Sequence, residues 1–207
     1  MTSLTHLRVV DLLDAFASND PLPAGGSAAA LTGAVGTSLL MMVATLPKTK
    51  TGGAGETTVL AAAAVRLRPV RDELTELIQR DSESYSSLLT AIRAPRGTDD
   101  ERARRQEEIL AATHLATEVP MQTIRAASSA LHSAVDVAEN GSRAASGDVA
   151  AAIELLLGAV RTACHSVDSN LAALKDSEYV QQMAAERQQL EAESQADAGR
   201  ARDALLE

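Results

Sequence analysis

Apolar residues recur every three or four positions along most of the chain, which is the spacing that places them on one face of an α-helix. In the longest such stripe, Leu67, Val70, Leu74 and Leu88 follow this period. No segment shows the strict alternation of a half-buried strand. The predicted helices cover residues 5–18, 27–46, 57–93, 98–140, 148–174 and 177–207.

Helix-breaking and helix-capping residues mark the limits of these segments. Two prolines and two glycines interrupt the pattern in 19–26, and Ser27 is a good N-cap for the helix that follows. Thr98 and Glu101 have the spacing of a capping box. Pro69 lies inside a predicted helix and should kink or break it near Arg68.

Composition supports the same fold class. Hydrophobic residues make up 45% of the 207 residues, but aromatic residues only 1%, and alanine occurs in runs. Helices favour Ala and Leu, whereas strands favour aromatic and β-branched residues. We therefore expect an all-α protein: one domain over residues 1–207, folded as an up-and-down bundle of five to six helices. The thin apolar stripe of 177–207 suggests an exposed or partner-packed helix rather than a core one, and we expect a dimer.

The segment 27–46 carries no charge and is long enough to span a bilayer. It has no Trp or Tyr at its ends, and small residues at 29, 33 and 37 would allow close helix packing. We expect a helix buried within the bundle and no membrane partner. The charged N-terminus does not resemble a signal peptide, and the single Cys164 excludes an internal disulfide. These features fit a cytoplasmic protein.

Net charge and histidine spacing argue against a nucleic-acid-binding protein and against a metalloprotein. The net charge of −9 argues against nucleic acid as a partner, because duplex-binding surfaces are basic. His6, His114, His132 and His165 have no metal-ligand spacing, so we expect neither a metal site nor a cofactor.

Asp81 is the residue that fits a simple bundle least well. It occupies a position in the stripe of residues 67–92 where an apolar side chain is expected. An unpaired buried carboxylate is costly, so the group must be paired, protonated or exposed to a cavity. Asp81 is therefore either a functional acid or half of a structural ion pair.

Gly25, Gly26 and Ser27 precede or begin a helix, where free N–H groups favour an anion. A plain loop with an N-cap would have the same sequence. Lys50 lies in a loop and is either a ligand for an anion or a solvated charge.

Two further polar residues lie near the ends of the segment 148–174. Asp148 stands where an N-cap is wanted, and capping alone would explain it. Asn170 flanks the apolar face and is either a core amide or a ligand-binding group.

Several segments, in order along nearly the whole chain, resemble motifs of the folate cyclodeaminase/cyclohydrolase family. PLPAGGSAAA at 21–30 resembles P-x-P-G-G-G-S-A-A-A, and DSESY at 81–85 resembles D-A-E-A-F/Y. RAPR at 93–96 resembles R-L-P-K, and Asp148-Val149 with Asn170-Leu171 resembles S/T-D-x-x-V…N-V-x-x-N-L. The chain departs from these motifs at Ala24, Gly147 and Ser166.

The resemblance implies a cytoplasmic, homodimeric, all-helical enzyme acting on a tetrahydrofolate derivative. Asp81 corresponds to the proton donor proposed for the family. Gly25, Gly26, Ser27 and Lys50 would bind the anionic folate tail, and Asp148 and Asn170 the pterin. Because no formiminotransferase domain accompanies the chain, hydrolysis of 5,10-methenyltetrahydrofolate to 10-formyltetrahydrofolate is the expected reaction. The alternatives are a formiminotetrahydrofolate cyclodeaminase, a lyase that releases ammonia, and a non-catalytic helical interaction or regulatory protein.

Overall fold

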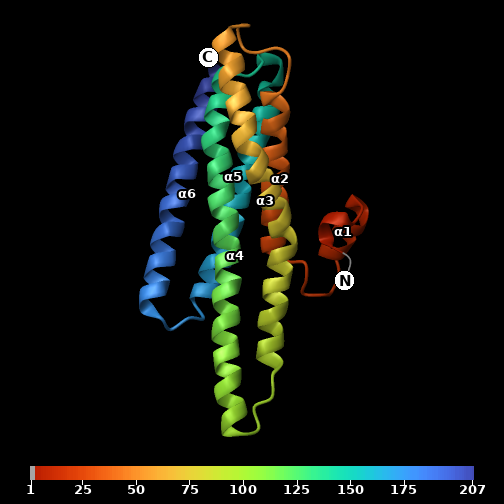
Figure 1. Ribbon diagram of the computed structural model, residues 1–207, viewed down its shortest axis with the longest axis vertical. Helices are drawn as coiled ribbons and strands as arrows, with labels where there is room; N and C mark the ends of the chain where they lie inside the picture. Colours follow the sequence, from red (N-terminus) through yellow and green to blue (C-terminus); the bar gives the residue numbers. More distant parts are fainter. Residues whose placement is uncertain (1–2) are drawn as a thin grey trace.

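The computed structural model describes residues 3–207, and these residues form helices and loops without a β-strand. Five long helices form the bundle: α2 (Gly25–Ala44), α3 (Ala54–Arg93), α4 (Asp99–Asn140), α5 (Ser146–Leu171) and α6 (Ser177–Leu206). Successive long helices run in opposite directions (Figure 1). The predicted all-α, up-and-down bundle is confirmed.

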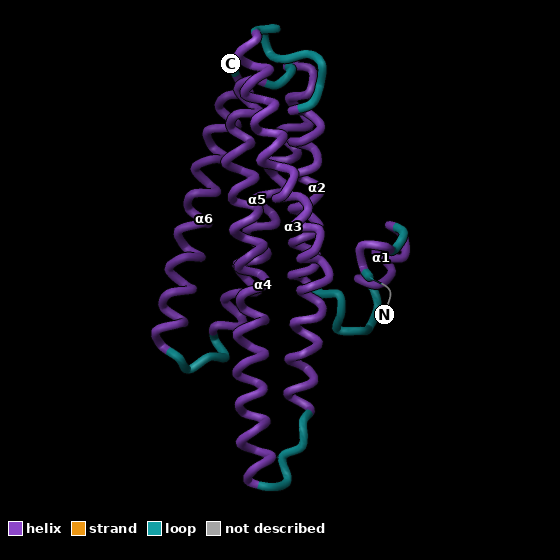
Figure 2. The backbone as a smooth tube through the Cα atoms, viewed as in Figure 1, coloured by secondary structure: helices purple, strands orange, loops and turns teal. Residues whose placement is uncertain are grey.

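The short elements lie at the edges of the bundle. η1 (Leu4–His6) contacts α3, and α1 (Val9–Phe16) stands to one side of the long helices (Figure 2). The 3₁₀ turn η2 (Arg143–Ala145) leads into α5. The helix expected over 5–18 is therefore shorter, and Val9, Val10 and Leu13 are exposed. Only Leu12 of α1 is buried.

α2 is the most apolar of the long helices. It packs against α3 and α5 and contacts α4. It is also the one helix of residues 3–207 that is long and apolar enough to cross a membrane. More than half of its apolar window is buried inside the protein, which supports the expected core helix.

Glycine sets the distance between α2 and its neighbours. A Cβ on Gly36 would lie 2.9 Å from Cγ of Leu156 and 3.0 Å from the carbonyl oxygen of Ala152, both on α5. A Cβ on Gly33 would lie 3.2 Å from a methyl group of Leu74 on α3. Small residues thus allow the close packing that the sequence predicted for this helix.

We expect Gly36→Ala to lower the free energy of unfolding by about 1 kcal/mol or more, because overpacking outweighs the gain in helix propensity. Gly158→Ala is the matched control, since an added Cβ on this α5 glycine meets nothing within 4 Å. The control should stabilise the protein by up to about 1 kcal/mol. Urea titrations of both variants measure the difference, and equal stabilities would contradict the packing argument.

α6 differs from its expected role. Met183, Ala198, Ala201 and Ala204 are buried against the rest of the core, so this helix packs within its own chain. Its stripe looks thin in the sequence because alanine supplies most of the contact with α4 and α5. Arg125 of α4 also pairs with Glu186 of α6. α6 is therefore a core helix, contrary to the expectation that it would lie outside the core.

One expected break is absent, and two helices begin earlier than expected. α3 is continuous from Ala54 to Arg93, so Pro69 does not break it, and the helix packs against both α2 and α4. α2 begins two residues before Ser27, after Ala24 as N-cap. α5 begins before Asp148, whose exposed carboxylate lies in the first turn and interacts favourably with the helix dipole.

Other local predictions were correct. Thr98 and Glu101 form the capping box of α4, and the Asp176 side chain accepts hydrogen bonds from the first turn of α6. Cys164 is a buried free thiol, and burial raises its pKa to about 11.

Candidate active site

Asp81 lies on α3 opposite the beginning of α2. Its Oδ2 accepts a hydrogen bond of 2.9 Å from the Ser27 hydroxyl, and Oγ of Ser27 also lies 3.1 Å from that of Ser82. Ser27 is fully buried, whereas Asp81 is half-buried. The serine predicted as a helix cap thus holds the carboxyl group of another helix.

Gly26 leaves the space that this carboxyl group occupies. A Cβ at position 26 would lie 2.0 Å from Oδ1 of Asp81 and 2.5 Å from its Cγ. A Cβ on Gly25 would meet nothing within 4 Å. The two glycines therefore differ: Gly26 lets α2 approach the acid, and Gly25 leaves its backbone open to the surrounding space.

Burial raises the pKa of Asp81 above its ordinary value of 3.8. Hydrogen bonds from the hydroxyl and the backbone N–H of Ser27 act in the opposite direction, because they stabilise the carboxylate, but they only partly offset the desolvation. Among residues 3–207, no ion pair includes Asp81. Of the alternatives left open by the sequence, the structural ion pair is excluded within this part of the chain.

Asp81 lines a cavity of about 370 Å³. Its walls come from the start of α2, from α3, from Ala116 of α4 and from the C-terminal half of α5. Asn170 also lines it, and its side-chain amide donates a 2.6 Å hydrogen bond to the carbonyl oxygen of Ala116. The cavity therefore brings together Gly25, Gly26, Asp81 and Asn170, with Ser27 directly behind the acid.

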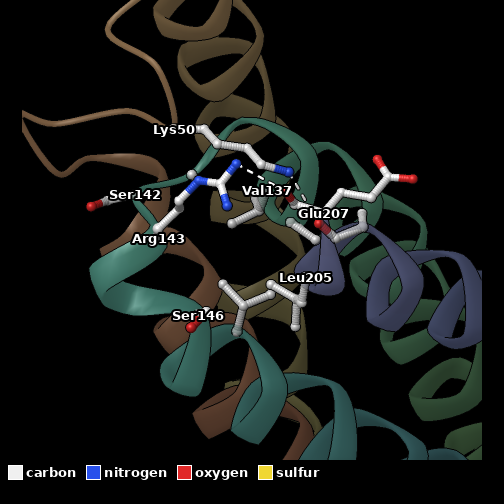
Figure 3. A pocket seen from close by; sticks show the side chains of 11 residues that line it. Lys50, Val137, Ser142, Arg143, Ser146, Leu205 and Glu207 are labelled. Carbon is white, nitrogen blue, oxygen red and sulfur yellow. Dashed lines mark hydrogen bonds between the residues drawn. The ribbon is translucent and has the colours of Figure 1, made fainter.

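Lys50 does not belong to this cavity. It lines a second one, of about 240 Å³, beyond the other end of α2, where Nζ donates a 3.1 Å hydrogen bond to the carbonyl oxygen of Ala204 (Figure 3). Arg143 lies beside it and donates to the carbonyl oxygen of Glu207. Lys50 thus helps to hold the end of α6, a role that the sequence did not suggest.

Asp148 is also remote from Asp81. It lies 22 residues before Asn170 on the same continuous helix, a separation of about 33 Å at 1.5 Å per residue. One pterin cannot contact both side chains within one chain. The sequence predicted them as a pair, and the length of α5 separates them.

Sequence reasoning missed the polar wall that α5 contributes to the cavity. This wall consists of Thr162, His165, Ser166, Ser169 and Asn170. Their spacing of three or four residues is itself a helical period, so they form a polar stripe beside the apolar one. The sequence contains this stripe, although its histidine has no metal-ligand spacing. In residues 3–207, no group of three or more metal-ligating His, Cys, Asp or Glu side chains occurs.

Comparisons with known proteins show the family and the fold. The profile of the formiminotransferase-cyclodeaminase family matches residues 8–189. The chain is 34% identical over 119 residues to a methenyltetrahydrofolate cyclohydrolase from Methylorubrum extorquens, covering 58% of this chain and 57% of that protein. It is 31% identical over 98 residues to a formimidoyltransferase-cyclodeaminase from Gallus gallus, covering 47% of this chain and 18% of that protein. The matches thus span little more than half of one relative and about a fifth of the other.

A solved structure shares the fold over nearly the full length. It is the formiminotetrahydrofolate cyclodeaminase of Thermotoga maritima, with a TM-score of 0.86 and 23% sequence identity. The superposition covers 97% of this chain and 96% of that one.

Proposed function

The chain belongs to the formiminotransferase-cyclodeaminase family, and from this premise we propose that it is a one-carbon folate enzyme. The proposed reaction is hydrolysis of 5,10-methenyltetrahydrofolate to 10-formyltetrahydrofolate. Similarity to the Methylorubrum cyclohydrolase favours this reaction over the others open to the family. We also propose that the protein is cytoplasmic, as expected from the single cysteine, Cys164.

The observation that carries the proposal is the state of Asp81. Its carboxyl group lines a cavity and forms no ion pair within residues 3–207, and burial raises its pKa. Such an acid retains its proton at a higher pH than an exposed Asp and can give it to a substrate. Its cavity also presents the amide of Asn170 and the open backbone of Gly25, which suit a polar heterocycle.

The reaction requires several proton transfers. Water adds to the carbon between N5 and N10, the bond from that carbon to N5 breaks, N5 gains a proton, and one proton is released. We assign to Asp81 the protonation of N5. When the carbon–oxygen double bond forms, Asp81 recovers a proton from the hydroxyl group of the intermediate, so the acid is regenerated in each cycle.

The decisive experiment follows the ultraviolet absorbance of 5,10-methenyltetrahydrofolate with and without the purified protein. Loss of the absorbance faster than in buffer supports hydrolysis. Release of ammonia from 5-formiminotetrahydrofolate would instead support cyclodeamination, the alternative favoured by the fold shared with the Thermotoga enzyme. If neither substrate reacts, the protein is a non-catalytic helical interaction or regulatory protein.

We further propose a homodimer formed through α2 rather than through α6. One face of α2 remains open, and its apolar side chains Val35 and Met42 are 46% and 41% exposed. These residues lie two helical turns apart on the same face, and Val65 of the neighbouring α3 is 73% exposed. A contiguous exposed apolar surface of this kind favours association.

We expect Val35→Asp to convert the dimer to a monomer, because a symmetric interface would bury two unpaired charges. Light scattering at micromolar concentration measures the mass. Leu110→Asp, at an exposed apolar position of α4 away from this face, is the control and should leave the dimer intact. A wild-type monomer would refute the dimer.

The homodimer would also give Lys50 and Asp148 a place in the substrate site. With a two-fold axis at the middle of α2, the α2 helices of the two subunits would run antiparallel. The end of the bundle that carries Lys50 in one subunit would then lie close to Gly25 of the other. We propose that both residues contact the folate from the second subunit, with Lys50 at the anionic tail.

On this proposal, we expect Lys50→Ala to raise KM for the folate while leaving kcat nearly unchanged. A charge that contacts the tail equally in ground and transition states contributes uniform binding. Arg143→Ala is the control, since it also frees a carbonyl group at the end of α6. The control should lower stability, by about 1 kcal/mol, without changing KM. A fall in kcat at constant KM for Lys50→Ala would contradict the assignment.

A further inference from the structure

Two proton-transfer groups face the same cavity from different helices. Asp81 enters from α3 and His165 from α5, and Tyr85 of α3 is the other titratable residue in its wall. His165 is exposed at the cavity, so water reaches both the imidazole and the carboxyl group.

His165 differs from the histidines that have structural contacts. His132 pairs with Asp197 at 3.3 Å, and the ring of His114 lies against Tyr179 with centroids 4.3 Å apart. Within residues 3–207, His165 has neither type of contact. Its ring nitrogens are therefore available to a water molecule or a ligand in the cavity.

The proposed hydrolysis needs an acceptor as well as a donor. The attacking water must lose a proton as its oxygen bonds to the carbon, and a carboxyl group that still holds its own proton cannot accept it. Imidazole is the side chain best suited to accept protons near neutral pH. A cavity with an acid on one wall and an imidazole on another supplies both functions.

We propose that His165 is the catalytic base that takes the first proton from the attacking water, an inference that rests on the proposed hydrolysis. The water oxygen bonds to the carbon between N5 and N10, and the imidazole becomes imidazolium. Asp81 then protonates N5 as the C–N5 bond breaks, and the remaining hydroxyl proton returns to Asp81. The imidazolium releases its proton to solvent, which is the one proton that the overall reaction yields.

The charged surroundings of His165 can be assigned element by element. From α3, Asp81 and Tyr85 share its cavity; α2 contributes only Ala24, Gly25 and Gly26, and α4 only Ala116. On α5 itself, Arg161 and Asp168 lie within four residues, and Asp168 pairs with Arg187 of α6 at 3.2 Å. Asp81 is thus the carboxyl group that shares the reaction space with His165.

The test measures turnover of 5,10-methenyltetrahydrofolate by His165→Ala and His165→Gln across pH 5–8. We expect kcat to fall at least tenfold, with little change in KM, and the decline of the wild-type rate at acid pH to disappear, because no imidazole remains to be protonated. Added imidazole should restore part of the rate to His165→Ala. His6→Ala, which changes an exposed histidine outside the cavity, is the control and should behave as wild type.

The outcomes separate the two proposals. If the wild-type protein hydrolyses the substrate and both variants match it, the role of His165 is refuted while the proposed function stands. The role of His165 is also refuted if kcat falls, added imidazole does not restore it, and the rate still declines at acid pH. That result would indicate that His165 only shapes the cavity. If the wild-type protein does not hydrolyse the substrate, the proposed function fails, and the role of His165 in it fails as well.

Discussion

Asp81→Asn should lower kcat for hydrolysis of methenyltetrahydrofolate by a factor of about 10² or more. The amide keeps the shape of the side chain and still accepts the hydrogen bond from Ser27, but it has no proton to give to N5. KM should change little, because the cavity walls remain in place. Steady-state kinetics on the purified variant measures both constants, and a wild-type kcat in a folded variant would refute the role of Asp81.

Stability of the same variant provides an independent measurement. A carboxyl group whose pKa is raised by burial stabilises the fold fully only below its unfolded value of about 3.8, and this contribution is lost as pH rises through the folded value. The amide of Asp81→Asn does not ionise, so the variant does not lose stability as pH rises. Its free energy of unfolding near pH 7 should therefore equal or exceed that of the wild type. A decrease of roughly 3–5 kcal/mol would instead indicate a broken buried ion pair.

Gly26→Ala should reduce kcat to a similar extent, although position 26 carries no chemistry of its own. The new Cβ would lie 2.0 Å from Oδ1 of Asp81, so the carboxyl group must leave its position. A displacement of about 1 Å at a reacting group can cost about 10²-fold in rate. Gly25→Ala has open space and should retain most of the wild-type kcat.

Circular dichroism and thermal unfolding of the two glycine variants complete this test. Both should remain helical, because alanine has a higher helix propensity than glycine. If Gly25→Ala and Gly26→Ala keep the same kcat, then the contact between Gly26 and Asp81 does not control the acid.

Local sequence patterns were sufficient to predict most of the helical segments and to single out Asp81 as a candidate site residue. Apolar residues at intervals of three or four positions, and caps such as Thr98 and Asp176, act over a few residues, so they can be read along the chain. Asp81 was identifiable because a carboxyl group interrupted an otherwise apolar stripe. These signals are local, and the structure retained each of them.

Tertiary packing decided which of the candidate residues lie together. It joined Gly26 and Ser27 to Asp81 across 55 and 54 residues of sequence, and it separated Asp148 from Asn170 by the length of α5. It also placed Lys50 at the end of α6 and buried that helix against its own chain. Motif order along a chain does not contain these distances, because they depend on how long antiparallel helices are aligned by close contacts such as those at Gly33 and Gly36.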